Sequence, residues 1–182
     1  MGMPVPLYYT AEMVRAFPDD GRRYEVVAGE LLVTPAPRFW HQHLVGRLSL
    51  ALGTYLLDQP AGVLVHSPAD ISWGPDVLVQ PDLFVVPLDQ ARTLEWTAMR
   101  DLLLVVEVLS PSTVRADRFV KRCRYQEAGV PLYWIVDGDA RQVEVWTPTD
   151  RFPCIERAAL QWAPAGAVSP FHLDLADLFR PI

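Results

Sequence analysis

Two carboxylates interrupt apolar segments of this sequence. Glu107 lies within residues 102–109, which read Leu-Leu-Leu-Val-Val-Glu-Val-Leu, and Asp82 lies within residues 77–86, which read Val-Leu-Val-Gln-Pro-Asp-Leu-Phe-Val-Val. Burying an ionised carboxylate without a partner is costly, so each of these groups must be compensated. Either group alone fits a salt bridge to an arginine or an exposed strand end. Two convergent carboxylates together suit a hard divalent cation such as Mg²⁺, which prefers oxygen ligands and retains several waters.

Lys121 is the single lysine of the chain, beside 15 arginines. The absence of asparagine and the low isoleucine count indicate a GC-rich genome, in which lysine is replaced by arginine wherever the protein permits. An arginine cannot replace a lysine where a compact ammonium must meet a reacting oxygen or a metal-bound water, because guanidinium is a broad planar fork. Lys121 is therefore either an exposed residue retained by chance or an amine that the chemistry of a site requires.

The elements that position these residues follow from the apolar periodicity. Strands are predicted at residues 24–27, 30–34, 62–73, 76–86, 102–109, 132–136 and 142–146. Helices are predicted at residues 11–17, 39–57 and 114–128. The tail is rich in proline and carries short strand-like pieces, with a closing turn near residues 175–179. This order predicts an α/β fold with a mixed central sheet flanked by helices, the strand at 102–109 being central. We expect one domain, residues 1–182, because the chain shows no repeat and no linker.

The helix at residues 114–128 carries two stripes. Ala116, Phe119, Val120 and Cys123 form an apolar stripe, which predicts packing against the sheet. Lys121 lies on a roughly opposite stripe, away from an arginine-rich face that meets either phosphates or water. The lysine thus follows the Glu107 strand directly without belonging to the solvated arginine face.

Composition narrows the class of protein. With 51% hydrophobic and 21% charged residues, the chain is typical of a soluble globular protein rather than a disordered or collagen-like one. A net charge of −6 argues against a protein that coats polyanions through a basic surface. The spacing of the two cysteines matches no disulfide framework, which favours a reducing compartment. The sequence shows no signal-peptide pattern and no apolar run long enough to span a membrane. We therefore expect a cytoplasmic protein that has no contact with a membrane.

The ordered set of motifs resembles the PD-(D/E)XK nuclease superfamily, and more closely the Uma-type family of restriction-endonuclease-like proteins. The resemblance covers roughly residues 22–146. It is carried by Pro81-Asp82, Glu107 and Lys121, and by the stretches at 23–31, 35–37, 41–42, 80–82, 106–113 and 129–137. It implies a restriction-endonuclease-like core with an N-terminal hairpin and C-terminal strands. It also implies nucleic acid, DNA in particular, as the partner, and a homodimer.

The chemistry that the resemblance implies is metal-assisted hydrolysis of a phosphodiester bond. Asp82, Glu107 and the backbone carbonyl of Val108 would hold Mg²⁺, with Mn²⁺ as a substitute. Lys121 would orient the attacking water or stabilise the developing negative charge. If the two carboxylates repel each other in a metal-free site, Asp82→Asn should slightly stabilise the protein.

Two side chains of the N-terminal hairpin are further candidates. Glu30 is the first choice for an additional site carboxylate and Glu25 the second, because strand alternation alone does not choose between them. His41 lies at the start of the long helix, and its functional interpretation is a role on the substrate side of the site or as a helix cap.

One departure from the superfamily pattern keeps other functions open. The superfamily lysine follows the acidic residue by two positions in the same strand, and that position is Leu109 here. Lys121 would have to reach the site from the following helix. Leu109 and the net charge favour a catalytically inactive DNA- or protein-binding module of the same fold, whereas the placement of Lys121 opposes it. A metal-dependent hydrolase acting on another substrate is a third alternative.

Overall fold

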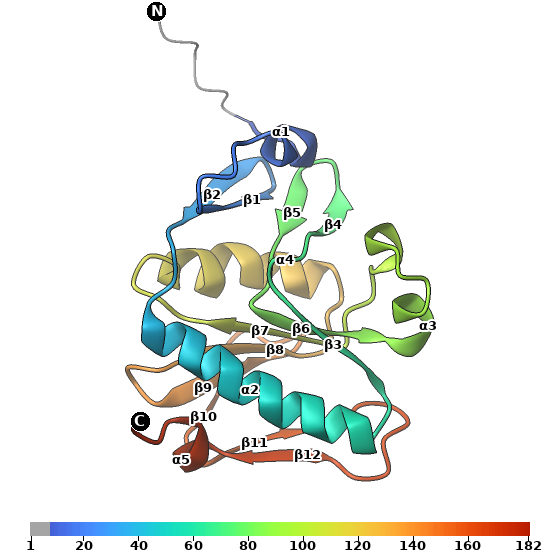
Figure 1. The fold of residues 1–182 in the computed structure, drawn as a ribbon, viewed down its shortest axis with the longest axis vertical. Helices are drawn as coiled ribbons and strands as arrows, with labels where there is room; N and C mark the ends of the chain where they lie inside the picture. The colour runs from blue at the N-terminus through green and yellow to red at the C-terminus, as the bar shows by residue number, and fades with distance from the viewer. Residues whose placement is uncertain (1–7) are drawn as a thin grey trace, which may run out of the picture.

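The computed structural model describes residues 8–182 and is built around a six-stranded mixed sheet (Figure 1). Its strand order is β10-β9-β8-β7-β6-β3. The strands are β3 (Gly62–His66), β6 (Leu83–Pro87), β7 (Leu104–Val108), β8 (Tyr133–Asp137), β9 (Gln142–Trp146) and β10 (Cys154–Glu156). The β7–β8 pair is parallel and the other pairs are antiparallel. Every residue of β7 is buried, which confirms the predicted central strand.

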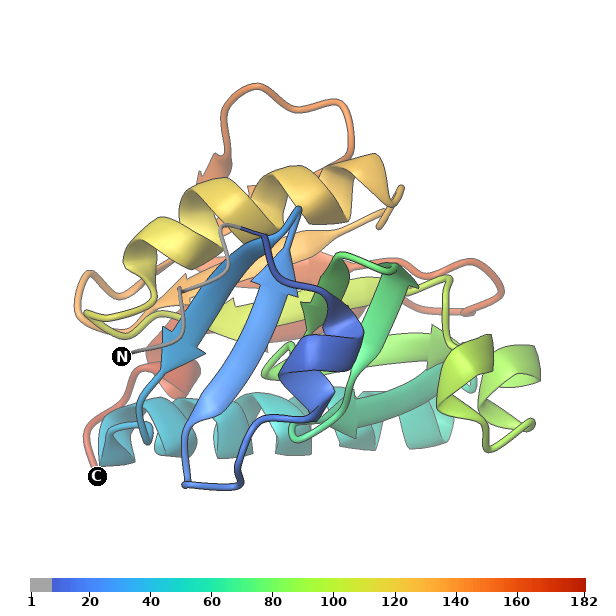
Figure 2. The same cartoon turned by 90° about the horizontal axis from the view of Figure 1, so that it is seen from above.

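Helices cover the two faces of this sheet, as predicted. The long helix α2 (Phe39–Asp58) lies on one face, and its leucines pack against residues of β6, β7 and β8. On the other face lies α4 (Arg122–Glu127), which continues a π-helical segment at Ala116–Lys121 (Figure 2). Alternation along β7 sends Val106 and Val108 toward α2, and Val105 and Glu107 toward α4.

A second sheet of order β2-β1-β5-β4 stands beside the α4 face. It consists of β1 (Arg23–Val27), β2 (Glu30–Thr34), β4 (Ile71–Gly74) and β5 (Val77–Val79), and the short helix α1 (Ala11–Arg15) packs on it. The β1–β2 hairpin turns as predicted, with Ala28 at φ 49° and Gly29 at φ 78°. Both values lie in the left-handed region that a two-residue hairpin turn requires.

The predicted strands at 62–73 and 76–86 are wrong as single strands, because each divides between the two sheets. The first becomes β3 and β4, separated by a linker that contains Pro68. The second becomes β5 and β6, separated by Gln80, Pro81 and Asp82. Proline cannot donate a hydrogen bond to a strand ladder, so each proline ends the pairing and lets the chain pass to the other sheet. Asp82 therefore immediately precedes β6 instead of lying within a strand.

The apolar stripe predicted for the helix at 114–128 is right for two of its members and wrong for the other two. Ala116 and Val120 are partly buried and pack against the hydrophobic core. Phe119 is 61% exposed and Cys123 is exposed, whereas Asp117, Lys121 and Tyr125 face the sheet and are buried. The polar side chains are buried because their ionic and hydrogen-bonding partners lie beneath the helix. The three residues are spaced four apart, and this spacing places helical side chains on one face.

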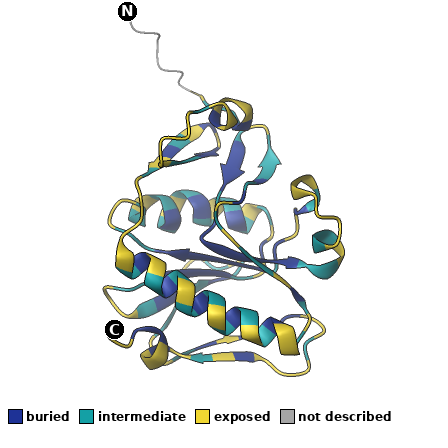
Figure 3. Ribbon diagram, in the orientation of Figure 1, coloured by how far each residue is buried: buried dark blue, intermediate teal, exposed yellow. Residues whose placement is uncertain are grey.

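The remaining elements close the α2 side of the molecule. The hairpin of β11 (Ala159–Trp162) and β12 (Phe171–Asp174) and the short helix α5 (Leu175–Leu178) pack beside α2 (Figure 1). They confirm the predicted C-terminal strands and closing turn. Between β6 and β7, the short helix α3 (Leu88–Ala91) precedes a 3₁₀ turn at Trp96–Ala98. None of the helices in residues 8–182 is both long and apolar enough to cross a membrane. Buried and exposed positions alternate along α2, as Figure 3 shows.

Candidate active site

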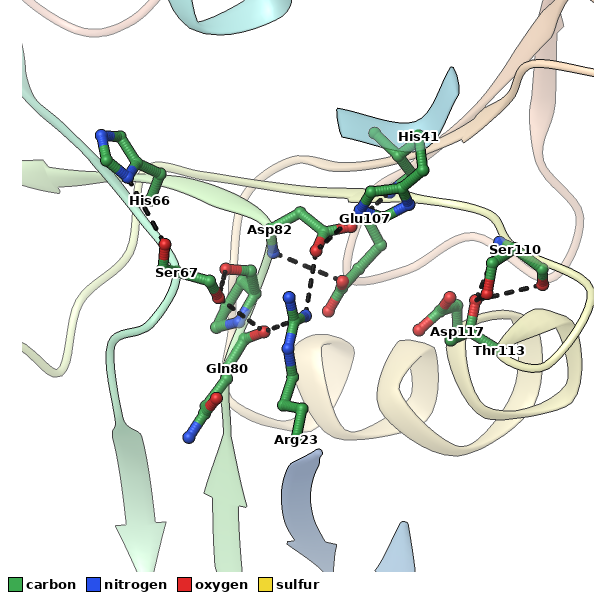
Figure 4. A network of polar contacts seen from close by, with 12 residues as sticks. Arg23, His41, His66, Ser67, Gln80, Asp82, Glu107, Ser110, Thr113 and Asp117 are labelled. Atoms are coloured by element: carbon green, nitrogen blue, oxygen red, sulfur yellow. Dashed lines mark hydrogen bonds and ion pairs between the residues drawn. The ribbon is translucent and has the colours of Figure 1, made fainter. Parts of the chain in front are cut away.

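The two sheets border a cleft of about 510 Å³ that contains four of the predicted site residues. Asp82, Glu107, Val108 and Lys121 line it, although they come from a loop, a strand and a helix. The register of the central sheet explains the meeting of the first two. Leu83 pairs with Val106 in the antiparallel β6–β7 ladder, so the preceding Asp82 lies opposite Glu107 (Figure 4).

Asp82 is held by basic groups and by the backbone. Its Oδ1 lies 2.9 Å from Nη1 of Arg23 and 3.5 Å from Nε2 of His41, while its Oδ2 accepts a 2.9 Å hydrogen bond from the Val108 N–H. Burial alone would raise the pKa of Asp82. The hydrogen bond and charge of His41, the charge of Arg23 and the Val108 N–H outweigh burial, and the pKa falls to about 2. Asp82 is therefore an anion at neutral pH.

Glu107 projects from β7 toward the helix on the opposite side from α2. Its Oε1 lies 3.0 Å from Nζ of Lys121 and accepts a 3.0 Å hydrogen bond from the Tyr125 hydroxyl. Its Oε2 lies 3.4 Å from the Asp82 backbone nitrogen. Burial raises the pKa of Glu107 well above its ordinary value, although the charge of Lys121 opposes that rise. A cation at this position favours the ionised form.

Lys121 is surrounded by three carboxylates. Its Nζ lies 2.9 Å from Glu25 Oε1, 3.0 Å from Glu107 Oε1 and 3.4 Å from Asp117 Oδ1. Burial lowers the pKa of Lys121, but these carboxylates outweigh burial and raise the pKa well above its ordinary value. Lys121 therefore carries its proton at neutral pH and serves as a cation rather than as a base.

The cluster has more carboxyl groups than cations. Three buried carboxyl groups share the ammonium of Lys121, and burial raises the pKa of Asp117 to about 6. Within residues 8–182, Glu25 Oε2 is a buried oxygen without a hydrogen-bond donor, and Asp117 Oδ1 has only the Lys121 ammonium at 3.4 Å and no hydrogen bond. The deficit of donors makes this cluster receptive to an additional cation.

The structure brings Glu25 into the cluster and leaves Glu30 outside it. Glu25 is completely buried and accepts a 2.7 Å hydrogen bond from the Gln80 backbone. Glu30 is exposed and pairs with Arg115 at 2.7 Å. Glu30 lies directly opposite Val27 in the hairpin, and Val27 is two residues after Glu25 on β1. Both glutamates therefore point to the same face of the hairpin. Alternation cannot separate them. The two glutamates differ in their distance from the central sheet, because Glu30 lies at the hairpin turn.

The oxygen ligands present fit a cation that retains much of its hydration shell. Within residues 8–182, no group of three or more His, Cys, Asp or Glu side chains is arranged to hold a metal ion. Asp82 and Glu107 supply carboxylate oxygens, and the Val108 carbonyl points to the same side of β7 as its N–H, which bonds Asp82. Mg²⁺ is commonly bound by one or two carboxylates, waters and substrate phosphates rather than by a complete protein cage.

Sequence reasoning missed three residues of this cleft. Arg23 and Asp117 were not identified, and His41 was given no place at the carboxylates. Arg23 is two residues from Glu25 on one face of β1, and Asp117 is four residues before Lys121 on the helix. Both spacings were available signals, since they place each residue beside one already identified.

The fold and cleft define a mixed α/β domain of the restriction-endonuclease-like class. A crystal structure from Anabaena variabilis ATCC 29413, titled as that of "a putative nuclease belonging to DUF820", is similar to this chain with a TM-score of 0.78. The two chains are 20% identical, and the match covers 94% of this chain and 97% of the other. At this identity the likeness establishes the fold.

The sequence places the chain more narrowly. Residues 11–166 match the model of the Uma2 family, described as "Putative restriction endonuclease", and the chain belongs to that family. This confirms the resemblance seen in the motifs. Among curated proteins, none matches the sequence significantly.

Proposed function

We propose that this protein is a Mg²⁺-dependent nuclease that hydrolyses phosphodiester bonds, with DNA as its substrate. The observation that carries the proposal is the convergence of Asp82, Glu107 and Lys121 in one cleft from three different elements. A restriction-endonuclease-like family and fold support the same activity.

In the proposed mechanism, each residue has a distinct role. Asp82, Glu107 and the Val108 carbonyl would hold the divalent cation, which activates water and neutralises phosphate charge when bound. Lys121 is protonated and is held in place by Glu25 and Asp117. Its positive charge stabilises the negative charge that develops on the phosphate. We assign Glu25 this positioning role in place of Glu30, which faces solvent with Arg115.

The mouth of the cleft suits a phosphate backbone. Arg22 and Arg38 line the cleft, and so does the hydroxyl-rich loop Ser110-Pro111-Ser112-Thr113. These groups provide a local basic and polar surface on a chain whose net charge is −6. Few phosphate contacts against an acidic background predict weak binding that declines as salt rises.

The test of this proposal is a Mn²⁺ titration of the wild type and of Asp82→Ala, followed by cleavage assays on single- and double-stranded substrates. We expect one bound ion in the wild type, its loss in Asp82→Ala, and cleavage that requires Mg²⁺ or Mn²⁺. Asp58→Ala, which removes an exposed carboxylate at the end of α2, is the matched control. Indistinguishable titrations of wild type and Asp82→Ala would contradict the proposal.

A second candidate is a catalytically inactive DNA- or protein-binding module. The specific observation in its favour is that protein cations already compensate the carboxylates, Arg23 at Asp82 and Lys121 at Glu25 and Glu107. This candidate predicts nucleic-acid or protein binding that EDTA leaves unchanged, without cleavage under any metal condition. The same titration and cleavage assays separate the two candidates.

We further propose a homodimer in the cytoplasm, on the basis of the family resemblance and the absence of disulfide-forming cysteine spacing in the sequence. Sedimentation analysis of the purified protein tests the oligomeric state, and a monomer at micromolar concentration contradicts it.

A further inference from the structure

A second cavity adjoins the candidate active-site cleft. It has a volume of about 700 Å³ and lies between β4, α1 and the Trp96–Ala98 turn. Pro68, in the linker from β3 to β4, lines both cavities. The Trp73 indole N–H donates a 2.8 Å hydrogen bond to the Arg100 carbonyl and so ties β4 to the segment after the turn. The two cavities therefore share a wall at Pro68.

The walls of this cavity combine two tryptophans with two arginines. Trp96 is 48% exposed. Trp73 is partly buried against the hydrophobic core, bonds the Arg100 carbonyl and contacts Tyr125 edge-on with ring centroids 6.1 Å apart. Arg15 and Arg100 line the same cavity. Aromatic faces beside guanidinium groups are the usual means by which proteins bind single-stranded nucleic acid.

The acidic side chain of the cavity is already compensated. Asp70 lies 3.7 Å from Arg15 and accepts a 2.8 Å hydrogen bond from the Gln80 side chain. The arginine that pairs with it is half exposed, so its remaining donors face solvent. The cavity as a whole therefore presents two arginines against one satisfied carboxylate.

We propose that this cavity binds the unpaired nucleotides next to the phosphodiester bond in the cleft, so that the substrate is single-stranded nucleic acid. Bases stack on Trp96 and Trp73, and their phosphates contact Arg15 and Arg100. The inference rests on the proposed nuclease function and narrows its substrate class. A duplex conceals the base faces that the tryptophans would contact, and so uses only the arginines.

The test measures binding in EDTA, where cleavage is suppressed, by fluorescence anisotropy of labelled 15-nucleotide DNA, the same sequence as RNA, and its DNA duplex. We expect tighter binding of single strands than of duplex. Trp96→Ala should weaken single-strand binding at least about fivefold and change duplex binding little, because stacking is lost. Arg100→Ala should reduce the salt slope of single-strand binding by about 0.7, the value of one phosphate contact.

The matched controls lie at the opposite edge of the central sheet, between β9 and β10. Phe152→Ala and Arg151→Ala each remove an exposed side chain of the same kind there, and both should bind like the wild type. Single-strand binding by Trp96→Ala and Arg100→Ala equal to that of the wild type overturns the inference. So does equal or tighter binding of duplex. Metal-dependent cleavage that requires Asp82 leaves the proposed function standing in either case, whereas its absence with intact binding removes the nuclease and keeps the binding site.

Discussion

At the scale of single residues, the environment of Lys121 defines the size of the group that fits there. The ammonium is 2% exposed and contacts carboxylate oxygens of Glu25, Glu107 and Asp117 within 3.4 Å. A guanidinium is broader and planar, and it presents its donors as a fork rather than from one point. The site therefore selects lysine by geometry as well as by charge.

Lys121→Arg should abolish most nuclease activity and also destabilise the protein by about 1–3 kcal/mol, because a larger group is forced into a packed site. Activity is measured on the preferred substrate with Mg²⁺, and stability by urea unfolding. Arg115→Lys, on an exposed face of the same helix, is the control and should change neither quantity. Full activity in Lys121→Arg would remove Lys121 from the mechanism.

Asp82→Asn should destabilise the metal-free protein, not stabilise it as the sequence alone suggested. Arg23, His41 and the Val108 N–H lower the pKa of Asp82 from 3.8 to about 2, which corresponds to about 2 kcal/mol at neutral pH. This stability is present above the unfolded pKa and is lost as pH falls through the folded pKa. The difference in unfolding free energy between wild type and variant should therefore close between about pH 4 and pH 2.

Urea unfolding in EDTA at pH 7 and at pH 3 measures this difference. Asp58→Asn, at an exposed position, should match the wild type at both pH values. An Asp82→Asn variant as stable as the wild type at pH 7 would show that repulsion from Glu107 outweighs the ion pair with Arg23.

The sequence reveals the acidic residues of the site more readily than the basic ones. Asp82 and Glu107 stand out because each interrupts an apolar run, which is energetically unfavourable unless something compensates it. Arg23 is one of 15 arginines, and its spacing from Glu25 places it on the same face of β1 but does not show that it meets Asp82. That contact joins residues 59 positions apart and depends on the placement of the whole second sheet.

At the scale of elements, short-range signals predicted the hairpins and helices but not where two strands divide. The turn at Ala28-Gly29 and the leucine spacing of α2 are local, so the sequence sufficed for both. The passage of the chain from one sheet to the other at Pro68 and Pro81 depends on what pairs with each half. This division puts Asp82 at the start of β6, where its side chain meets the Val108 N–H.

The question of which face of the helix around Lys121 is buried gives a prediction at the scale of elements. Phe119→Gln should change stability by less than about 0.5 kcal/mol because the side chain is exposed, although the sequence placed it in the core. Tyr125→Ala should cost about 3–5 kcal/mol, because it leaves a cavity beneath the helix and removes a donor from Glu107. Thermal unfolding of both variants distinguishes the two faces, and the opposite order of stabilities would restore the stripe predicted from the sequence.

At the scale of the whole molecule, the second sheet and the central sheet share one hydrophobic cluster. It joins Val27, Ile71 and Val79 of the second sheet to Phe84 and Val105 of the central sheet. The candidate active-site cleft lies along this junction, and its residues come from both sheets. The geometry of the site therefore depends on the two sheets remaining packed together.

We propose on this basis that residues 1–182 form a single domain, and that it unfolds in one cooperative step. A shared core cannot be exposed in one sheet while the other stays intact, so tryptophan fluorescence and far-UV circular dichroism should give the same urea midpoint. Val79→Ala, within the shared cluster, should shift both signals equally and toward lower urea. Exposed Val168→Ala is the control and should shift neither. Two separated transitions, with Val79→Ala moving only one of them, would show instead that the second sheet unfolds as an independent unit.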